Sequence, residues 1–203
     1  SSHFASAEKQ FRYPLEYGNQ RPPASTWTVT GAGAYIVGNK PLNKKKCVLI
    51  KGITTGKIVD YGVKDSMNMG ACMAPAAAEL IEANFKDLDV DKDYYDAVFT
   101  GDLGEIGNRI LSELLKEKGI DIADKLFDCG MLIYEGETKC SGGSGCGCSA
   151  VVLGTYIMDK LVRGEYKRVL FVPTGALLST VSYNEGKSVP GIAHGVILEG
   201  KES

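Results

Sequence analysis

Strand-like and helix-like segments alternate along most of the chain, and this alternation limits the folds open to it more than any other feature. Short apolar runs with the length of buried strands are followed by segments whose apolar residues recur every three or four positions. The run Asp96–Thr100, for example, leads into a helical pattern that Gly119 closes. Such alternation is typical of a mostly parallel sheet covered by helices. We therefore expect an α/β domain with the order β-α-β-α-β-α-β-β after a first strand at Gly31–Val37.

The pattern also places the individual elements. A helix is expected to start at Pro75, because proline suits a first helical turn. A later helix ends at Arg163, and its apolar residues surround most of its circumference, which predicts a fully buried helix. The remaining strands are expected at Cys47–Tyr61, Cys129–Tyr134, Lys167–Val172 and Gly191–Leu198.

Composition and charge exclude several functional classes. The chain has 203 residues, of which 44% are hydrophobic and 24% charged, as in an ordinary soluble globular protein. Its net charge of -2 gives no overall basic field for nucleic acid or an anionic membrane. The basic run Lys44–Lys46 is interpreted as a solvated strand edge. We expect no transmembrane segment, because no stretch approaches the roughly 20 apolar residues required, and we see no signal peptide.

The six cysteines are better explained as reduced thiols than as disulfides or metal ligands. Zinc sites prefer cysteine pairs two to four residues apart, whereas Cys146 and Cys148 are separated by a single residue. The two histidines, His3 and His194, lie far away in sequence, so we expect no metal site and no cofactor. A redox role stays open for Cys140, Cys146 and Cys148. His194 lies in an apolar strand and is interpreted as a core histidine.

Two turns are candidate ligand sites. The glycine-rich turn Ser141–Ser149 runs straight into an apolar helix, where free amides could hold a carboxylate, a phosphate or a developing oxyanion. The alternative is a crowded turn at which the helix start packs against a sheet. The turn Thr100–Gly104 follows a strand end, where ligands bind in such sheets. Its Asp102 could accept a hydrogen bond, act as a base, or cap the following helix.

Seven motifs, taken together and in order, resemble the stage V sporulation protein AD family of the thiolase-like superfamily. The resemblance covers essentially the whole chain, and because known members are considerably longer, it implies a carboxy-terminal fragment. The motifs are Ser1–His3 with Glu8–Pro14 and Glu16–Gly18, Thr28–Ala34, Met73–Ala78, Thr100–Leu103, Gly142–Cys146, Thr174–Ser179 and Pro190–Gly195.

The resemblance implies a thiolase-like fold, in which two similar β-α-β-α-β-α-β-β halves stack as α-β-α-β-α layers. Residues 1–203 would form one partial thiolase-like domain. Residues 1–40 would be the end of the first half, and residues 41–203 the whole second half.

The resemblance also indicates that condensation chemistry is absent. Condensing enzymes of the superfamily use a nucleophilic cysteine with His and Asn, and the segment carrying that cysteine would precede Ser1. Gly101 and Asp102 stand in the turn similar to the one that carries the histidine, and Gly143 and Ser144 stand in the loop similar to the one that carries the asparagine. None of them supplies an imidazole or a side-chain amide. We expect no catalytic residue, with His3 and Cys146 as the candidate replacements.

Family members are known to bind dipicolinic acid and to move calcium dipicolinate into and out of spores. The resemblance therefore implies a degenerate pocket for a planar ring with two carboxylates. The residues expected to bind this ligand are His3, Gly101, Asp102, Gly143, Ser144 and Cys146.

The implied partners are dipicolinic acid or its calcium chelate, membrane proteins of the spore dipicolinate channel, and a second copy in a homodimer. No nucleic acid is expected. The implied location is the forespore or spore, peripheral at the inner membrane. Two alternatives stay open: an acyltransferase acting on an acyl thioester, and a soluble scaffold subunit of a membrane channel complex.

Overall fold

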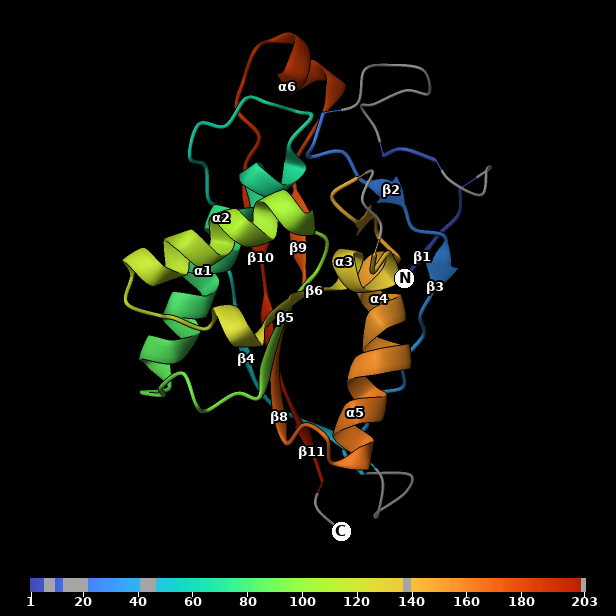
Figure 1. Ribbon diagram of the computed structural model, residues 1–203, viewed down its shortest axis with the longest axis vertical. Coiled ribbons are helices and arrows are strands. Elements are labelled where there is room, and N and C mark those ends of the chain that lie inside the picture. The colour runs from blue at the N-terminus through green and yellow to red at the C-terminus, as the bar shows by residue number, and fades with distance from the viewer. Residues whose placement is uncertain (6–9, 13–21, 41–46, 137–139, 202–203) are drawn as a thin grey trace.

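The protein is built around one five-stranded mixed sheet (Figure 1). The computed structural model describes residues 1–5, 10–12, 22–40, 47–136 and 140–201. Strand β11 runs antiparallel to both of its neighbours, whereas the other adjacent pairs are parallel. Four of the five strands therefore point the same way, which confirms the α/β class and the mostly parallel sheet. In spatial order the strands are β4 (Val48–Thr54), β11 (Gly195–Gly200), β8 (Arg168–Val172), β5 (Ala97–Thr100) and β6 (Leu126–Asp128).

Helices cover both faces of this sheet. Figure 1 shows α1 (Met69–Asp87) and α2 (Gly104–Glu117) on one side. On the other side lie α3 (Cys129–Ile133) and a long helix, which consists of α4 (Cys148–Val152), a wider π-helical turn (Leu153–Ile157) and α5 (Met158–Arg163). The predicted succession β-α-β-α-β-α-β-β is confirmed by β4, α1, β5, α2, β6, the long helix, β8 and β11.

Several short elements lie outside the five-stranded sheet. Three two-stranded ladders join β1 (Ser2–His3) to β3 (Gly31–Ala32), β2 (Trp27–Thr28) to β7 (Gly143–Ser144), and β9 (Thr174–Ala176) to β10 (Gly191–Ala193). The remaining elements are a 3-10 turn at Ala123–Lys125 and α6 (Thr180–Asn184).

The two faces of the sheet bury separate apolar clusters, because successive residues of a strand point to opposite sides. Val98 and Leu170 pack into the cluster under α1 and α2. Ala97, Phe99 and Val169 pack into the cluster under α3 to α5. Phe99 stacks on Phe127 at 5.2 Å between ring centroids.

Two predicted elements are wrong for identifiable reasons. The expected strand Cys129–Tyr134 is instead helix α3, because the side chain of Asp128 accepts a hydrogen bond from Met131 N and caps a helix there. The first helix starts at Met69 rather than Pro75, and Asn68 caps it. Pro75 therefore lies in the second turn of α1.

Three burial or length predictions also differ from the structure. The first strand, expected over Gly31–Val37, is reduced to the two residues of β3. The helix ending at Arg163 is not buried all round, since Gly154, Thr155 and Asp159 are exposed. His194 is also exposed rather than in the core, and its Nδ1 accepts a hydrogen bond from Gly56 N at 3.2 Å.

A search of the described residues finds no helix both long and apolar enough to cross a bilayer. The basic run Lys44–Lys46 and most of the motif segment Glu8–Gly18 lie outside the described residues.

Candidate functional site

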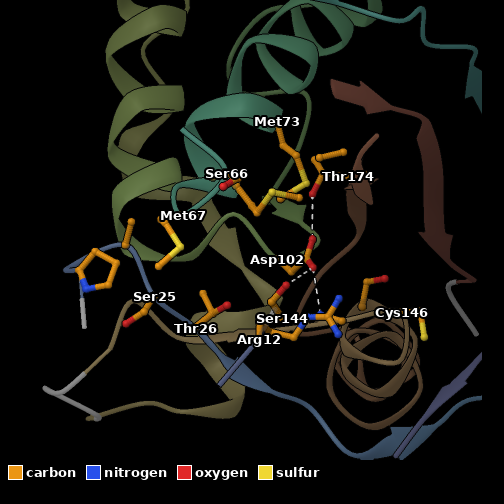
Figure 2. Close-up of a pocket in the computed structure, with 18 residues that line it drawn as sticks. Arg12, Ser25, Thr26, Ser66, Met67, Met73, Asp102, Ser144, Cys146 and Thr174 are labelled. Atoms are coloured by element: carbon orange, nitrogen blue, oxygen red, sulfur yellow. Dashed lines mark hydrogen bonds between the residues drawn. The ribbon is translucent and has the colours of Figure 1, made fainter. Parts of the chain in front are cut away.

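A pocket of about 350 Å³ opens where the parallel strands end (Figure 2). Asp102 follows β5 and Thr174 follows β8, so both reach the pocket from the carboxyl ends of neighbouring strands. The glycine-rich loop and the segment Pro22–Thr26 close its other sides. Met67, Met69 and Met73, around the start of α1, supply apolar lining.

Asp102 organises this pocket. Its Oδ2 accepts hydrogen bonds from Ser144 Oγ at 2.6 Å and from Gly145 N at 3.0 Å, and its Oδ1 accepts one from Thr174 Oγ1 at 3.3 Å (Figure 2). The cap of α2 is Leu103, which makes no side-chain capping bond. Of the three roles left open for Asp102, hydrogen-bond acceptance is therefore the one observed, and helix capping is wrong.

We predict that Asp102→Ala lowers the free energy of unfolding by about 1–3 kcal/mol, since the Gly145 amide and two hydroxyls lose their acceptor. Denaturant unfolding monitored by the single tryptophan, Trp27, would measure the change. Asp121→Ala, at an exposed position, is the control and should change stability by less than about 0.5 kcal/mol. Equal stabilities of the two variants would contradict an organising role for Asp102.

The glycine-rich loop is held in place by the segment that precedes β3. Trp27 N donates to Gly142 O, and Val29 N donates to Ser144 O, each at 2.9 Å. Gly142 and Gly145 have φ values of +122° and +126°, which favour glycine. The Gly145 amide already donates to Asp102, so it is not free to bind a ligand.

The structure brings together some of the six residues predicted from sequence and not others. Asp102, Ser144 and Cys146 line the pocket. Gly101 and Gly143 are buried outside its lining. A Cβ atom on Gly143 would lie 2.6 Å from a methyl carbon of Val29, so close packing explains that glycine, as the crowded-turn alternative proposed.

His3 contacts both Cys146 and Arg12. Arg12 was not identified from the sequence as a site residue. The Nδ1 atom of His3 is 3.5 Å from Cys146 Sγ, and its Nε2 atom is 3.5 Å from Arg12 Nη1. Figure 2 shows Arg12 reaching toward the loop that carries Ser144. Among the described residues Arg12 has no ion-pair partner, although it lines the pocket.

No spacing rule would have found Arg12. It is a single basic residue in a proline-interrupted segment, and only the fold carries that segment to the pocket through the bond from Arg12 N to Thr26 O (3.0 Å). Ser25, another lining residue, is 6% exposed, and its hydroxyl has no partner within the described part of the chain. Among the residues that the structure describes, the pocket lining thus contains one cation, one hydrogen-bonded carboxylate, several hydroxyls and three methionine side chains.

Among residues 1–5, 10–12, 22–40, 47–136 and 140–201, no three His, Cys, Asp or Glu side chains gather as a metal site would require.

The chain is similar in sequence to one known family. Residues 1–199 match the family described as stage V sporulation protein AD. The chain is 46% identical over 200 residues to stage V sporulation protein AD of Bacillus subtilis (strain 168); the match covers 98% of this chain and 58% of that relative's length.

Among solved structures, a tetronic acid condensing enzyme aligns with a TM-score of 0.44 and 17% identity over 75% of this chain and 47% of its own. The 3-oxoacyl-[acyl-carrier-protein] synthase III of Aquifex aeolicus VF5 aligns with a TM-score of 0.40 and 13% identity, over 78% of this chain and 55% of its own.

Proposed function

We propose that this chain, which belongs to the stage V sporulation protein AD family, binds dipicolinic acid or its calcium chelate in the pocket that Arg12 and Asp102 line. The observation that carries the proposal is Arg12, a pocket-lining guanidinium with no ion-pair partner among the described residues. Guanidinium and carboxylate groups match in geometry and form charge-assisted hydrogen bonds of about twice the usual strength.

The rest of the lining supports a small aromatic dicarboxylate. A volume of about 350 Å³ is at the small end of the range for ligand sites. Methionine sulfur contacts aromatic rings favourably, and Met67 and Met73 provide such a surface. Ser66 and Thr174 add hydroxyls for the second carboxylate.

Asp102 limits how this ligand can lie. Its charge is partly balanced by three hydrogen-bond donors, but it still repels a carboxylate placed beside it. We therefore place the first carboxylate at Arg12 and the second toward Ser66, away from Asp102. The calcium chelate carries less negative charge than the free dianion, so titrations with and without calcium test which form binds.

The bond between Asp102 and Ser144 supports binding over condensation. The resemblance implies that these two residues stand in the turns in which the superfamily's condensing enzymes carry His and Asn, and here Ser144 Oγ donates to Asp102 Oδ2 at 2.6 Å. A role as a peripheral subunit beside spore membrane proteins, and pairing with a second copy, remain further parts of the proposal. A pull-down from sporulating cells with surface variants would test them.

Isothermal titration with dipicolinate tests the binding proposal directly. We predict that Arg12→Gln weakens binding about tenfold to a hundredfold, because one charge-assisted bond is lost. Arg12→Lys keeps the charge without the planar fork and should bind with intermediate affinity.

Arg109→Gln is the matched control for this titration, since Arg109 is exposed on α2 and does not line the pocket. It makes the same change of net charge and should bind as the unmodified protein does. Absence of saturable binding, or equal weakening by both glutamine variants, would contradict the proposed site.

A further inference from the structure

We propose that Cys146 is a reactive thiol at the pocket, which His3 and Arg12 prepare for exchange with small disulfides that carry a negative charge. The three side chains form a chain of contacts from Cys146 Sγ to His3 Nδ1 and from His3 Nε2 to Arg12 Nη1, at 3.5 Å each. The thiol chemistry does not depend on dipicolinate binding.

Solvent exposure distinguishes Cys146 from the other cysteines. Cys146 is exposed and Cys47 is half-buried, whereas Cys72, Cys129, Cys140 and Cys148 are buried. Burial raises the pKa of the Cys72 thiol to about 11, and it raises the pKa values of Cys129 and Cys148 as well. The thiolate is the nucleophilic form, so the buried cysteines are poor competitors for a small disulfide.

The hydrogen-bond directions around His3 place a donor against the Cys146 sulfur. A guanidinium can only donate, so Nε2 of His3 accepts from Arg12 and the ring proton stays on Nδ1. That N–H faces Cys146 Sγ. The thiol donates to Ser2 O at 3.1 Å, and the imidazole N–H is placed to donate to the sulfur when that proton leaves during exchange.

The reaction is thiol–disulfide exchange, and the incoming disulfide is the oxidant. The Cys146 thiolate attacks one sulfur of R–S–S–R, a new bond forms between Sγ and that sulfur, and the original S–S bond breaks. The leaving thiolate takes the bonding electron pair, and the proton of Cys146 passes to solvent and then to the leaving group. Cys146 gains one –SR group, and one RSH is released.

The same geometry links this modification to the pocket. Cys146, Arg12 and Gly145 are all lining residues, so an attached group with a carboxylate would lie beside Arg12. It would then occupy the place that we assign to a ligand carboxylate. This consequence rests on the proposed function, whereas the reactivity of the thiol does not.

Reaction rates with two probes test the reactivity. The anionic probe is the disulfide of thionitrobenzoate, and the neutral probe is dithiodipyridine; the leaving group of each is followed by its absorbance. Under native conditions we expect one cysteine to react first, identified as Cys146 by peptide mass mapping, and all six to react after unfolding. Cys146→Ser should abolish the fast phase, whereas Cys47→Ser should keep it.

Variants of the two supporting residues separate activation from a general loss of structure. His3→Ala should slow the reaction of Cys146 about tenfold, and His3→Asn, which places an amide N–H near the position of Nδ1, should recover part of the rate. Arg12→Gln should slow the anionic probe more than the neutral one, whereas Arg109→Gln should leave the ratio of the two rates unchanged.

Three results would overturn the proposal: a faster reaction at another cysteine, an unchanged rate in His3→Ala, or equal slowing of both probes by Arg12→Gln. A dipicolinate titration, before and after labelling of Cys146, tests the proposed function independently of the thiol reactivity. Fast labelling without any dipicolinate binding would leave the thiol proposal standing and would count against the proposed function.

Discussion

Replacing Asp128 with alanine is expected to lower the free energy of unfolding by about 3–5 kcal/mol, the largest stability change predicted for this protein. The Asp128 carboxylate is 1% exposed. It accepts hydrogen bonds from Thr100 Oγ1 and Leu103 N at 2.8 Å, and from Gly104 N and Met131 N at 3.2 Å. Alanine would leave the three backbone N–H donors without this buried acceptor, whereas Thr100 Oγ1 would keep its bond to Phe127 O at 3.2 Å.

Burial and the nearby charge of Asp102 raise the pKa of Asp128, while the hydrogen bonds from Thr100, Leu103 and Gly104 act in the opposite direction. The stabilising effect of the side chain therefore comes from its hydrogen bonds rather than from an ion pair. Asp128→Asn keeps one acceptor oxygen but replaces the other with an NH2 group that faces existing donors. Its free energy of unfolding should therefore lie between those of the alanine variant and the unmodified protein.

Denaturant unfolding followed by the fluorescence of Trp27 would measure these differences, because Trp27 is 8% exposed and stacks on Phe11. Asp124→Ala, at an exposed position four residues away, serves as the control and should stay within about 0.5 kcal/mol. A loss below about 1 kcal/mol for Asp128→Ala would mean that water or neighbouring groups satisfy the freed donors.

Gly130→Ala is expected to be the second most damaging substitution, at about 2–4 kcal/mol, and to disturb the pocket as well. A Cβ atom on Gly130 would lie 1.9 Å from the carbonyl oxygen of Gly143, which is backbone and cannot rotate away. Either α3 or the glycine-rich loop must move. Ser144 and Gly145 follow directly and hold Asp102, so if the pocket binds dipicolinate as proposed, the misplaced lining should lower that affinity at least about tenfold.

Gly38→Ala is a suitable comparison, since its added Cβ would meet only Lys40 O at 3.7 Å, an ordinary contact. It should change stability by less than about 0.5 kcal/mol and leave the titration unchanged. If Gly130→Ala unfolded like Gly38→Ala, the close approach of α3 to the loop would not exist in solution.

The order of elements could be predicted from sequence because each one carries its own periodicity. Local signals failed where a contact from elsewhere decides the structure. The apolar residues after Asp128 suit a strand equally well, and only the buried carboxylate turns them into α3. His194 interrupts an apolar run, yet its side chain emerges between β10 and β11 and meets Gly56.

In the candidate site, too, residues marked by a local sequence pattern could be predicted, whereas residues placed by long-range contacts could not. Asp102, Ser144 and Cys146 were recognisable because they stand in turns at helix starts, and the fold does gather them. Gly101 and Gly143 share those turns but serve packing, which spacing alone cannot distinguish from ligand contact. Arg12 was missed because its position depends on long-range hydrogen bonds between segments that carry no periodic pattern.

The parallel ladder between β2 and β7 affects the order in which parts of the protein fold and open. Its partners are far apart in the chain, and the ladder is only two residues long on each strand. Contacts of that kind form late in folding and open early under native conditions. Arg12 and Ser25 line the pocket and are tied by backbone bonds to Thr26 and Ser141, next to this ladder, so we expect them to leave the pocket when the ladder opens. A ligand bound in the pocket would therefore stabilise the closed ladder. It would slow amide hydrogen exchange in residues 25–29 and 142–145 far more than in the central sheet.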